Sequence, residues 1–416
     1  MRKVTRVAAT FLCLTRLGMG SAFSQASAEA NLFQYLENMI SNIPASSSGV
    51  YEDPSAEQLE AWNEAFSSFS EGDYAAADVQ FSTLGYRIVL IKDTETGDPF
   101  YILEKQASSS NYWGTYVFNL KACRPNLALQ SPHPKYDSNT GSQGAYTFLA
   151  LNAGAFFLSG VNRCNSAAAS ECSGTTSACG SNAAFRISDP AHNDKGIFQA
   201  MTELVLESNP ASVFIQFHGF GKDSGDPNAI LSNGTRDTPE TDYIHLILRE
   251  MESLYPALNY KVIHKDLSWT KLTAFTNTQG RFINESLSPC SENATAASGQ
   301  FIHLEQERDV FRADAEGWDK WIKAMSIVFH CESEALGTDD SLIILYPNPV
   351  DDCLSIDGTT GKFTLQVINS LGQNVFEISQ QDWTNVNVSS VPSGMYMYRL
   401  IDNQGKIVEY GKLVKN

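Results

Sequence analysis

Three apolar segments of the chain end in side chains that could bind a divalent metal ion. His133 follows the run "NLALQ", with Asp137 four residues later, His218 follows "SVFIQF", and Glu305 lies near the end of "QFIHLE". Imidazole nitrogens and carboxylate oxygens are ligands of Zn²⁺, which in catalytic sites has three protein ligands and one open position. A further carboxylate can take a proton from water beside the metal. These residue types therefore indicate a hydrolytic zinc site.

Each of these side chains alone also has a structural explanation. A single histidine is often a hydrogen-bonded structural residue. Asp137 could cap a turn beside Asn139, and Glu305 could form an ion pair with Arg308 or Arg312. Their common placement favours the metal site, because ligands of a parallel sheet bind outside the carboxyl ends of its strands.

Further side chains could contact substrate or serve as other ligands. Asn277 and Arg281 lie in "TNTQGRFINES", where a planar guanidinium and an amide could bind a substrate carboxylate, although a surface turn with a salt bridge is the alternative. Arg163 in "GVNRCN" could be another anion contact. His303 shares one face of an extended strand with Glu305, and His192 in "ISDPAHNDKG" is a further possible ligand, together with Asp189.

Alternating strands and helices must position these residues. Between residues 126 and about 330, the predicted strands are "NLALQ", "SVFIQF", "YKVIH" and "QFIHLE". The predicted helices include "AYTFLALNAGAFFL", "GIFQAMTELVLES", "DYIHLILREMESLY" and "GWDKWIKAMSIVF". This alternation predicts an α/β fold with a mostly parallel sheet and helices on both faces. Before this α/β part, the sequence predicts two helices and then a hairpin over "GYRIVLIKDTETGDPFYILEK". The second helix begins with Ser55 and Gln58 in a capping-box pattern.

Composition and the N-terminus indicate an exported protein of two domains. The chain has 416 residues, 43% of them apolar, and a formal net charge of -18, which argues against nucleic acid or an anionic membrane surface as partner. Residues 1–28 combine a basic start, an apolar run and the small residues Ala26 to Ala28, which predicts a signal peptide. A buried N-terminal helix is the alternative, because Arg16 interrupts the apolar run. No other apolar run reaches about 20 residues, so no transmembrane anchor is expected.

The cysteines fit an oxidising compartment. Of the eight, Cys13 would leave with the signal peptide, and the other seven would be in an environment where disulfides persist. Cys164, Cys172 and Cys179 lie in a small, polar stretch that a local disulfide could staple. Their spacing does not match a paired C-x-x-C zinc site, and the odd number leaves at least one thiol free or paired elsewhere.

The C-terminal part has a different pattern. After the acidic stretch around residues 336–341, which reads as a linker, short alternating strands predict a small β-sandwich over residues 342–416. The ordered series "YPNP", "VINSLGQNVFEI", "VPSGMYMYRLIDNQGK" and "GKLVKN" resembles the type A sorting domain of the type IX secretion system. This resemblance implies export across the outer membrane to the surface or medium, with the type IX machinery as partner. A generic adhesion module is the alternative.

Residues 29–335 form the expected hydrolase domain. The series "SPHPKYDSNTG", "FIQFHGF", "NTQGRFIN" and "FIHLEQE" is similar to the zinc amidohydrolases of the carboxypeptidase-like fold, of the N-formylglutamate amidohydrolase and poly-γ-glutamate hydrolase type. The resemblance implies that His133, Asp137 and His218 are zinc ligands, that Glu305 is the general base, and that Asn277 with Arg281 holds a substrate carboxylate.

The same resemblance implies cleavage of an amide or peptide bond next to a carboxylate-bearing group. One departure concerns the acidic ligand, since carboxypeptidases commonly use H-x-x-E, whereas here the spacing is longer and the acid is Asp137. Two alternatives stay open: a secreted binding protein on a hydrolase-like scaffold, and a serine hydrolase, although the chain has no G-x-S-x-G motif.

Overall fold

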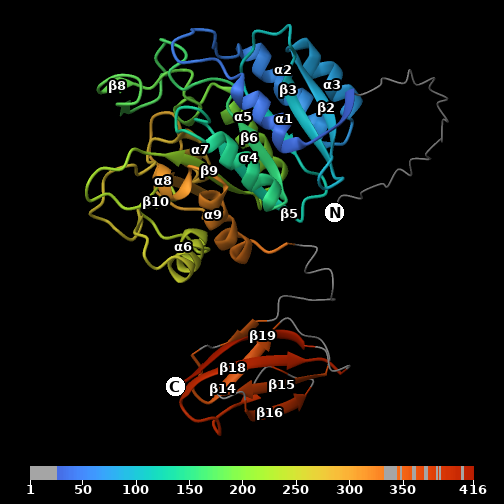
Figure 1. The fold of residues 1–416 in the computed structure, drawn as a ribbon, viewed down its shortest axis with the longest axis vertical. Helices are drawn as coiled ribbons and strands as arrows, with labels where there is room; N and C mark the ends of the chain where they lie inside the picture. The colour runs from blue at the N-terminus through green and yellow to red at the C-terminus, as the bar shows by residue number, and fades with distance from the viewer. Residues whose placement is uncertain are drawn as a thin grey trace, which may run out of the picture. The chain divides into compact units, whose positions relative to one another are not determined.

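The computed structural model divides the chain into two compact units, Met1–Ala324 and Met325–Asn416 (Figure 1). The residues that it describes are 26–331, 344–346, 349–357, 362–369, 373–380, 383, 386–403 and 407–416. Most of the predicted signal peptide, with Cys13, and the whole predicted linker lie outside these residues. Ala28, the last residue of the predicted signal peptide, lies within the first strand.

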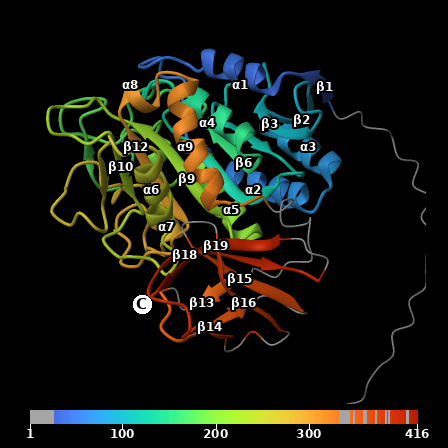
Figure 2. The same ribbon diagram turned by 60° about the horizontal axis from the view of Figure 1, so that its bottom comes forward.

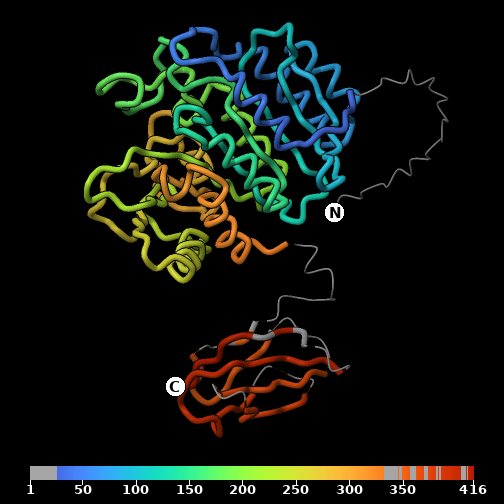
Figure 3. The backbone as a smooth tube through the Cα atoms, in the orientation of Figure 1, coloured from blue at the N-terminus to red at the C-terminus, as the bar shows by residue number. Residues whose placement is uncertain are grey.

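The first unit, whose backbone path Figure 3 traces, is built on one ten-stranded mixed sheet. In order across the sheet, its strands are β1 (Ala26–Ala30), β2 (Tyr86–Asp93), β3 (Pro99–Lys105), β4 (Thr115–Phe118), β6 (Ala153–Leu158), β5 (Arg124–Ser131), β9 (Val213–Gly219), β12 (Phe301–Gln306), β10 (Ala229–Ser232) and β11 (Tyr260–Val262). The central strands β6, β5, β9 and β12 are mutually parallel, while β2, β3 and β4 form an antiparallel meander. The parallel centre confirms the predicted α/β fold class.

Helices cover both faces of this sheet (Figure 2). One face carries α1 (Leu32–Ser41), α4 (Thr140–Ala150) and α9 (Ala315–Val328), and the other carries α2 (Ala56–Ser70), α3 (Tyr74–Thr83), α5 (Ile197–Ser208) and α7 (Thr278–Ile283). The shorter helices η1 (Pro190–His192) and α8 (Arg308–Phe311), the helix α6 (Tyr243–Leu254) and the small hairpin of β7 (Thr175–Thr176) and β8 (Ala183–Ala184) complete the unit. The predicted capping box is present at the start of α2, where Ser55 and Gln58 bond reciprocally.

Neighbouring residues of β6 show the division between the two faces. The ring of Phe156 stacks on Phe148 of α4, whereas the ring of Phe157 meets Phe198 of α5 edge-on. Both phenylalanines are fully buried. A strand buried on both faces reads as a continuous apolar run, as predicted for the centre of a parallel sheet.

Two predicted elements are wrong. The second helix expected before the hairpin is two helices, α2 and α3, with Gly72 between them at a φ of 82°. The segment "AYTFLALNAGAFFL" is a helix followed by a strand rather than a single helix. The helix α4 ends at Ala150, Asn152 adopts a left-handed conformation with φ 47°, and the strand β6 begins at Ala153. Gly154 permits close approach to β5, because a Cβ there would lie 2.3 Å from the carbonyl oxygen of Pro125. A short apolar run does not distinguish a buried strand from a helix by periodicity alone.

The face that α5 and α7 cover changes from apolar to polar toward the carboxyl ends of β5, β9 and β12. Side chains two residues apart on a strand share a face. From the apolar to the polar end, the successive rows of register partners are Ala128–Phe214–Phe301, Gln130–Gln216–His303 and His218–Glu305. The candidate site residues His218 and Glu305 therefore stand on an apolar core, at the carboxyl ends of the parallel strands, where ligands of such sheets generally bind.

Apart from the end of α9, the regular elements described in the second unit are all strands. Its described strands form two antiparallel sheets: β13 (Ile344–Tyr346), β14 (Cys353–Asp357) and β17 (Val386–Asn387) in one, and β16 (Asn374–Gln380), β15 (Phe363–Ile368), β18 (Gly394–Ile401) and β19 (Ile407–Lys415) in the other. Buried residues of both sheets, including Leu354, Leu365 and Leu400, form its core. These strands match the predicted small β-sandwich.

No helix among the described residues has the combination of length and apolar character needed to cross a bilayer.

The aromatic core under the antiparallel edge of the sheet gives a stability prediction. Trp62 of α2 is fully buried, and its ring meets the rings of Phe81 and Tyr86 edge-on at 5.0 and 4.8 Å. Replacing Trp62 with alanine should lower the free energy of unfolding by about 3–5 kcal/mol, because the substitution leaves a cavity. Urea denaturation of the full chain, followed by circular dichroism, measures this loss. The exposed Val79→Ala on α3 is the control and should change it by less than about 0.5 kcal/mol; equal effects would contradict the packing described.

Candidate metal centre

Three ligand atoms meet at the carboxyl ends of β5 and β9. The Nδ1 atom of His133 lies 3.1 Å from Oδ2 of Asp137, and the Nδ1 atom of His218 lies 3.3 Å from the same oxygen. All three side chains are buried, and their ligand atoms lie within 4.8 Å of one another. The structure thus brings together two residues of the loop after β5 and one from the end of β9.

The far nitrogen of each imidazole is held by another buried side chain. Nε2 of His133 lies 2.8 Å from Oδ1 of Asp189, and Nε2 of His218 lies 2.7 Å from Oε1 of Gln216. Metal-binding histidines almost always donate their second ring N–H to a carboxylate or another oxygen, which fixes the ring orientation. Both histidines have this arrangement. Asp189, an alternative acidic ligand in the sequence, therefore binds the outer nitrogen of His133 rather than joining the three ligand atoms.

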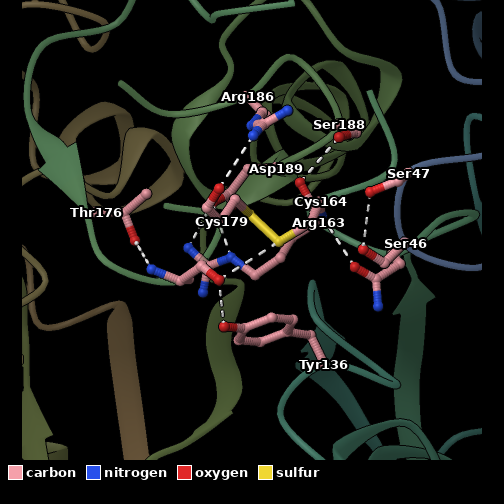
Figure 4. Close-up of a disulfide and its surroundings, with 12 residues drawn as sticks. Ser46, Ser47, Tyr136, Arg163, Cys164, Thr176, Cys179, Arg186, Ser188 and Asp189 are labelled. Atoms are coloured by element: carbon pink, nitrogen blue, oxygen red, sulfur yellow. Dashed lines mark hydrogen bonds and ion pairs between the residues drawn. A yellow bond between two sulfur atoms is a disulfide. The ribbon is translucent and has the colours of Figure 1, made fainter. Parts of the chain in front are cut away.

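A disulfide-braced loop delivers Arg163 and Asp189. The Nε and Nη2 atoms of Arg163 both donate to Oδ2 of Asp189, and its Nη1 atom lies 3.3 Å from Nδ1 of His133. Cys164, next to Arg163, forms a disulfide with Cys179 (Figure 4). This bridge confirms the predicted local staple and restrains the chain that carries Arg163.

The other cysteines are consistent with an oxidising environment. Cys172 forms a disulfide with Cys290, 118 residues later, so that it ties the loop of Arg163 to the segment after α7. Cys123 and Cys331 are also disulfide-bonded. Cys353, in the second unit, is the free and exposed cysteine of the described residues.

The electrostatics of the cluster favour positive charge beside Asp137. Burial raises the pKa of the Asp137 carboxyl, but the contacts with His133 and His218 outweigh burial and hold this pKa well below its usual value. Burial and Arg163 lower the pKa of His133, whereas Asp189 and Asp137 raise it, and the net shift is upward. Burial, more than any other cause, lowers the pKa of His218 to about 4, so this imidazole is neutral at pH 7.

Glu305 of β12 lies beside this cluster and has an unpaired oxygen. Burial, with a further contribution from the charge of Asp137, raises the pKa of Glu305 to about 8. Its Oε2 atom is buried and has no hydrogen-bond partner among the described residues. Buried polar atoms are rarely left unpaired in native proteins, so this oxygen marks a position where a ligand or water would be bound.

His303 belongs to the same cluster through His218. The two rings stack with centroids 4.2 Å apart, and Nε2 of His303 lies 3.9 Å from Oε1 of Glu305. The Nδ1 atom of His303 is buried without a partner in the described part of the chain. His303 therefore lines the site next to the general-base candidate.

The residues present fit a divalent metal ion such as zinc. Two imidazole nitrogens and one carboxylate oxygen form a donor set that Zn²⁺ accepts, and the second nitrogen of each histidine is already engaged. Glu305 belongs to the same group of side chains, since one ligand oxygen of its carboxylate lies within 4.8 Å of ligand nitrogens of His218 and His303. The donor chemistry and the orphaned oxygen agree with a metal site that has an open position.

Arg312 holds together the loops that surround this cluster. Its guanidinium donates to the carbonyl oxygens of Ser138, Phe220 and Gln306, which follow or end β5, β9 and β12 respectively. The sequence also allowed Glu305 to form an ion pair with Arg312. The described residues do not form this ion pair. Instead, Arg312 fixes the relative positions of three strand ends.

Two predicted substrate-binding residues have other contacts. The guanidinium of Arg281 donates to Phe275, Ser173, Pro289, Cys290 and Asn293, so its donors hold loops rather than face the histidines. Asn277 caps α7 and donates to Gln216.

His192, the other predicted alternative ligand, has its Nδ1 atom 3.2 Å from Asp189 and its ring stacked on Phe185. It therefore lies outside the three ligand atoms. Gln216 was missed by the sequence analysis, although a polar residue two positions before His218 in an apolar strand must share its face.

Residues 344–416 match the protein family described as "Secretion system C-terminal sorting domain". The match covers the described strands of the second unit and confirms the resemblance drawn from its motifs. This unit is a type IX secretion sorting domain, and the protein is secreted or displayed on the cell surface.

Among solved structures, the chain is similar to an N-formylglutamate amidohydrolase from Ralstonia eutropha JMP134, with 11% identity over 54% of this chain and 99% of that chain and a TM-score of 0.33. It is also similar to a candidate carboxypeptidase A from Shewanella denitrificans OS-217, with 10% identity over 57% of this chain and 61% of that chain and a TM-score of 0.25. No curated protein matches the chain. At these identities and TM-scores, the activities of these proteins do not transfer to this chain.

The buried pair of Arg163 and Asp189 gives a prediction about stability. Asp189→Asn should lower the free energy of unfolding by about 3–5 kcal/mol, because it leaves a buried guanidinium without its counter-charge. Urea denaturation measures the change. The matched control is Glu171→Gln, which removes an exposed ion pair with Lys195 and should have no resolvable effect. If both variants unfold like the unmodified protein, the buried pair does not stabilise the loop.

Proposed function

We propose that the first unit is a zinc-dependent amidohydrolase that acts outside the cell on an amide or peptide bond. The observation that carries this proposal is the convergence of His133 Nδ1, Asp137 Oδ2 and His218 Nδ1, with the unpaired Glu305 oxygen beside them. The sorting domain supports a site of action outside the cell, because it marks the chain for export.

His133, Asp137 and His218 would hold the metal ion. A zinc ion bound there supplies Lewis-acid chemistry, which polarises a carbonyl group and makes a water molecule more acidic. Asp189 and Gln216 hold the outer nitrogens of the two histidines, so both rings are oriented before the metal ion binds. Arg312 keeps the strand ends that carry these groups in register.

Glu305 would act as the general base and then as the general acid. Its raised pKa, near 8 in the absence of a metal ion, reflects a buried carboxylate that takes up a proton readily. Glu305 takes a proton from the attacking water on Oε2 and gives it to the nitrogen of the leaving amine, so that the C–N bond breaks with a neutral leaving group. The lack of a hydrogen-bond partner for Oε2 supports this role, because the atom can accept a proton from water without breaking an existing hydrogen bond.

Arg163 would stabilise the negative charge that develops on the carbonyl oxygen. Two of its three nitrogens are engaged by Asp189, which leaves Nη1 directed at the ligand atom of His133. A fixed cation next to the reacting carbonyl stabilises an oxyanion most strongly in a site shielded from water. The carboxylate-bearing group of the substrate, expected from the sequence, would also have to be bound by residues other than Arg281, whose donors are engaged by loops.

Metal analysis tests the ligand set. The purified full chain should contain about one Zn²⁺ per molecule, as expected for a mononuclear catalytic site. His218→Ala should abolish zinc retention, since only two ligands would remain. The control is His245→Ala, an exposed histidine of α6, which should keep the full zinc content. Full stoichiometry in the His218 variant, measured by elemental mass spectrometry, would contradict the ligand assignment.

The role of Glu305 predicts a variant that separates metal binding from catalysis. Glu305→Gln should keep the zinc content but lower kcat by about 10²–10⁴-fold, because the amide cannot accept the proton of water. The assay uses a panel of peptides, γ-glutamyl amides and N-acyl amino acids, with zinc content measured on the same samples. Undiminished turnover in this variant would exclude Glu305 as the general base.

A further inference from the structure

A chain of buried amide side chains leads from the N-terminus of α7 to His218. Oε1 of Gln216 contacts both Nε2 of His218 and Nδ2 of Asn277, while Nε2 of Gln216 contacts Gln130 and Gln279. These amide side chains are at most 1% exposed. Because water does not reach them, their hydrogen bonds must be satisfied by one another and by the backbone.

The direction of each bond follows from a backbone N–H group. The amide nitrogen of Gly280 can only donate, and it lies 2.9 Å from the side chain of Asn277, so the contacting atom of Asn277 is its oxygen. The NH₂ group of Asn277 therefore faces Gln216, and the atom that it meets there must be the carboxamide oxygen. That oxygen accepts from His218 as well, which places an N–H on Nε2 of His218.

A backbone carbonyl gives the same direction from the other end. The oxygen of Pro190 can only accept, and it lies 2.7 Å from the side chain of Gln279, so the NH₂ group of Gln279 faces Pro190. Its Oε1 atom then faces the NH₂ group of Gln216 at 3.1 Å. Both ends of the chain thus give Gln216 one orientation.

We infer that Asn277 and Gln216 are positioning residues: Asn277 turns the side-chain oxygen of Gln216 toward His218, which keeps a proton on Nε2 and makes Nδ1 the ring nitrogen that faces the metal ion. The inference rests on the proposed function, because it treats Nδ1 of His218 as a ligand atom. It also gives Asn277 a role different from the substrate contact expected from the sequence. A helix cap is coupled to a ligand atom through one glutamine.

The two histidines are oriented by different chemistry. His133 faces the carboxylate of Asp189, whereas His218 faces the neutral amide of Gln216. A carboxylate has only acceptor oxygens, so Asp189 meets an N–H on Nε2 of His133 whichever way the carboxylate is turned. An amide presents either a donor or an acceptor, so Gln216 fixes the proton of His218 only because its own orientation is set by Asn277 and Gln279.

The test compares two substitutions of Gln216 in the full chain. Gln216→Met removes the acceptor, whereas Gln216→Glu keeps an acceptor oxygen toward His218. In metal-free, ¹⁵N-labelled protein, the ring nitrogens of His218 should show the proton on Nε2 in the unmodified chain and in Gln216→Glu. Gln216→Met should show the proton shifted toward Nδ1, because Oδ2 of Asp137, 3.3 Å from Nδ1, is then the acceptor that remains.

Zinc affinity is the second readout. Gln216→Met should weaken zinc binding, measured by competition with a chelator, by about 10–100-fold, as is typical for loss of such a partner. Gln216→Glu should bind zinc at least as tightly as the unmodified chain. Asn277→Asp should shift the His218 proton toward Nδ1 and weaken zinc binding, because it keeps the helix cap but turns an acceptor toward Gln216.

Gln130→Met is the matched control. It removes the same kind of buried amide from the register partner of Gln216 but leaves the acceptor of His218 in place. It should change the unfolding midpoint without changing the tautomer or the zinc affinity, which separates positioning from packing.

The inference is overturned if Gln216→Met and Asn277→Asp keep both the Nε2 proton and the original zinc affinity. If one of these two variants does not fold, the other decides alone against Gln130→Met, because each of the two is expected to change both the tautomer and the zinc affinity. Because the tautomer is read without metal, an unmodified chain that has this tautomer pattern but binds no zinc overturns the proposed function and leaves the positioning role intact.

Discussion

The whole site depends on one buried carboxylate that two imidazoles share. Asp137 Oδ2 lies within 3.3 Å of a ring nitrogen of both His133 and His218, and the three side chains are shielded from water. A buried carboxylate is costly unless positive charge or hydrogen-bond donors compensate it. A divalent ion between these groups would compensate Asp137 and leave both outer ring nitrogens free to donate to the oxygens that hold them.

The fold supplies this geometry by means of strand ends rather than a single rigid element. The parallel strands β5, β9 and β12 end at the same edge of the sheet, and Arg312 links the loops at these ends through three carbonyl groups. Below the site, the register rows change from apolar side chains to amides and then to the reactive groups. Each layer positions the next, so the orientation of His218 depends on a helix cap as well as on its own strand.

The sequence predicted the helices and strands well where the hydrophobic periodicity was strong, and where a motif had a known physical basis, such as a helix cap. The capping box at Ser55, the helices α5 and α6, and the C-terminal sandwich follow from local pattern. The boundary between α4 and β6 could not be predicted, because an apolar run buried on both faces has no period. The grouping of His133, Asp137 and His218 was predictable from strand ends, whereas the loop contacts of Arg281 were not. They arise from the segment around the Cys172–Cys290 bridge, which sequence spacing does not reveal.

The most direct test of the central claim is anomalous diffraction from crystals of the zinc-replete protein, collected on both sides of the zinc absorption edge. The account predicts one strong peak bounded by Nδ1 of His133, Nδ1 of His218 and the carboxylate of Asp137. The absence of a peak at this position, or a peak at other side chains alone, would contradict it.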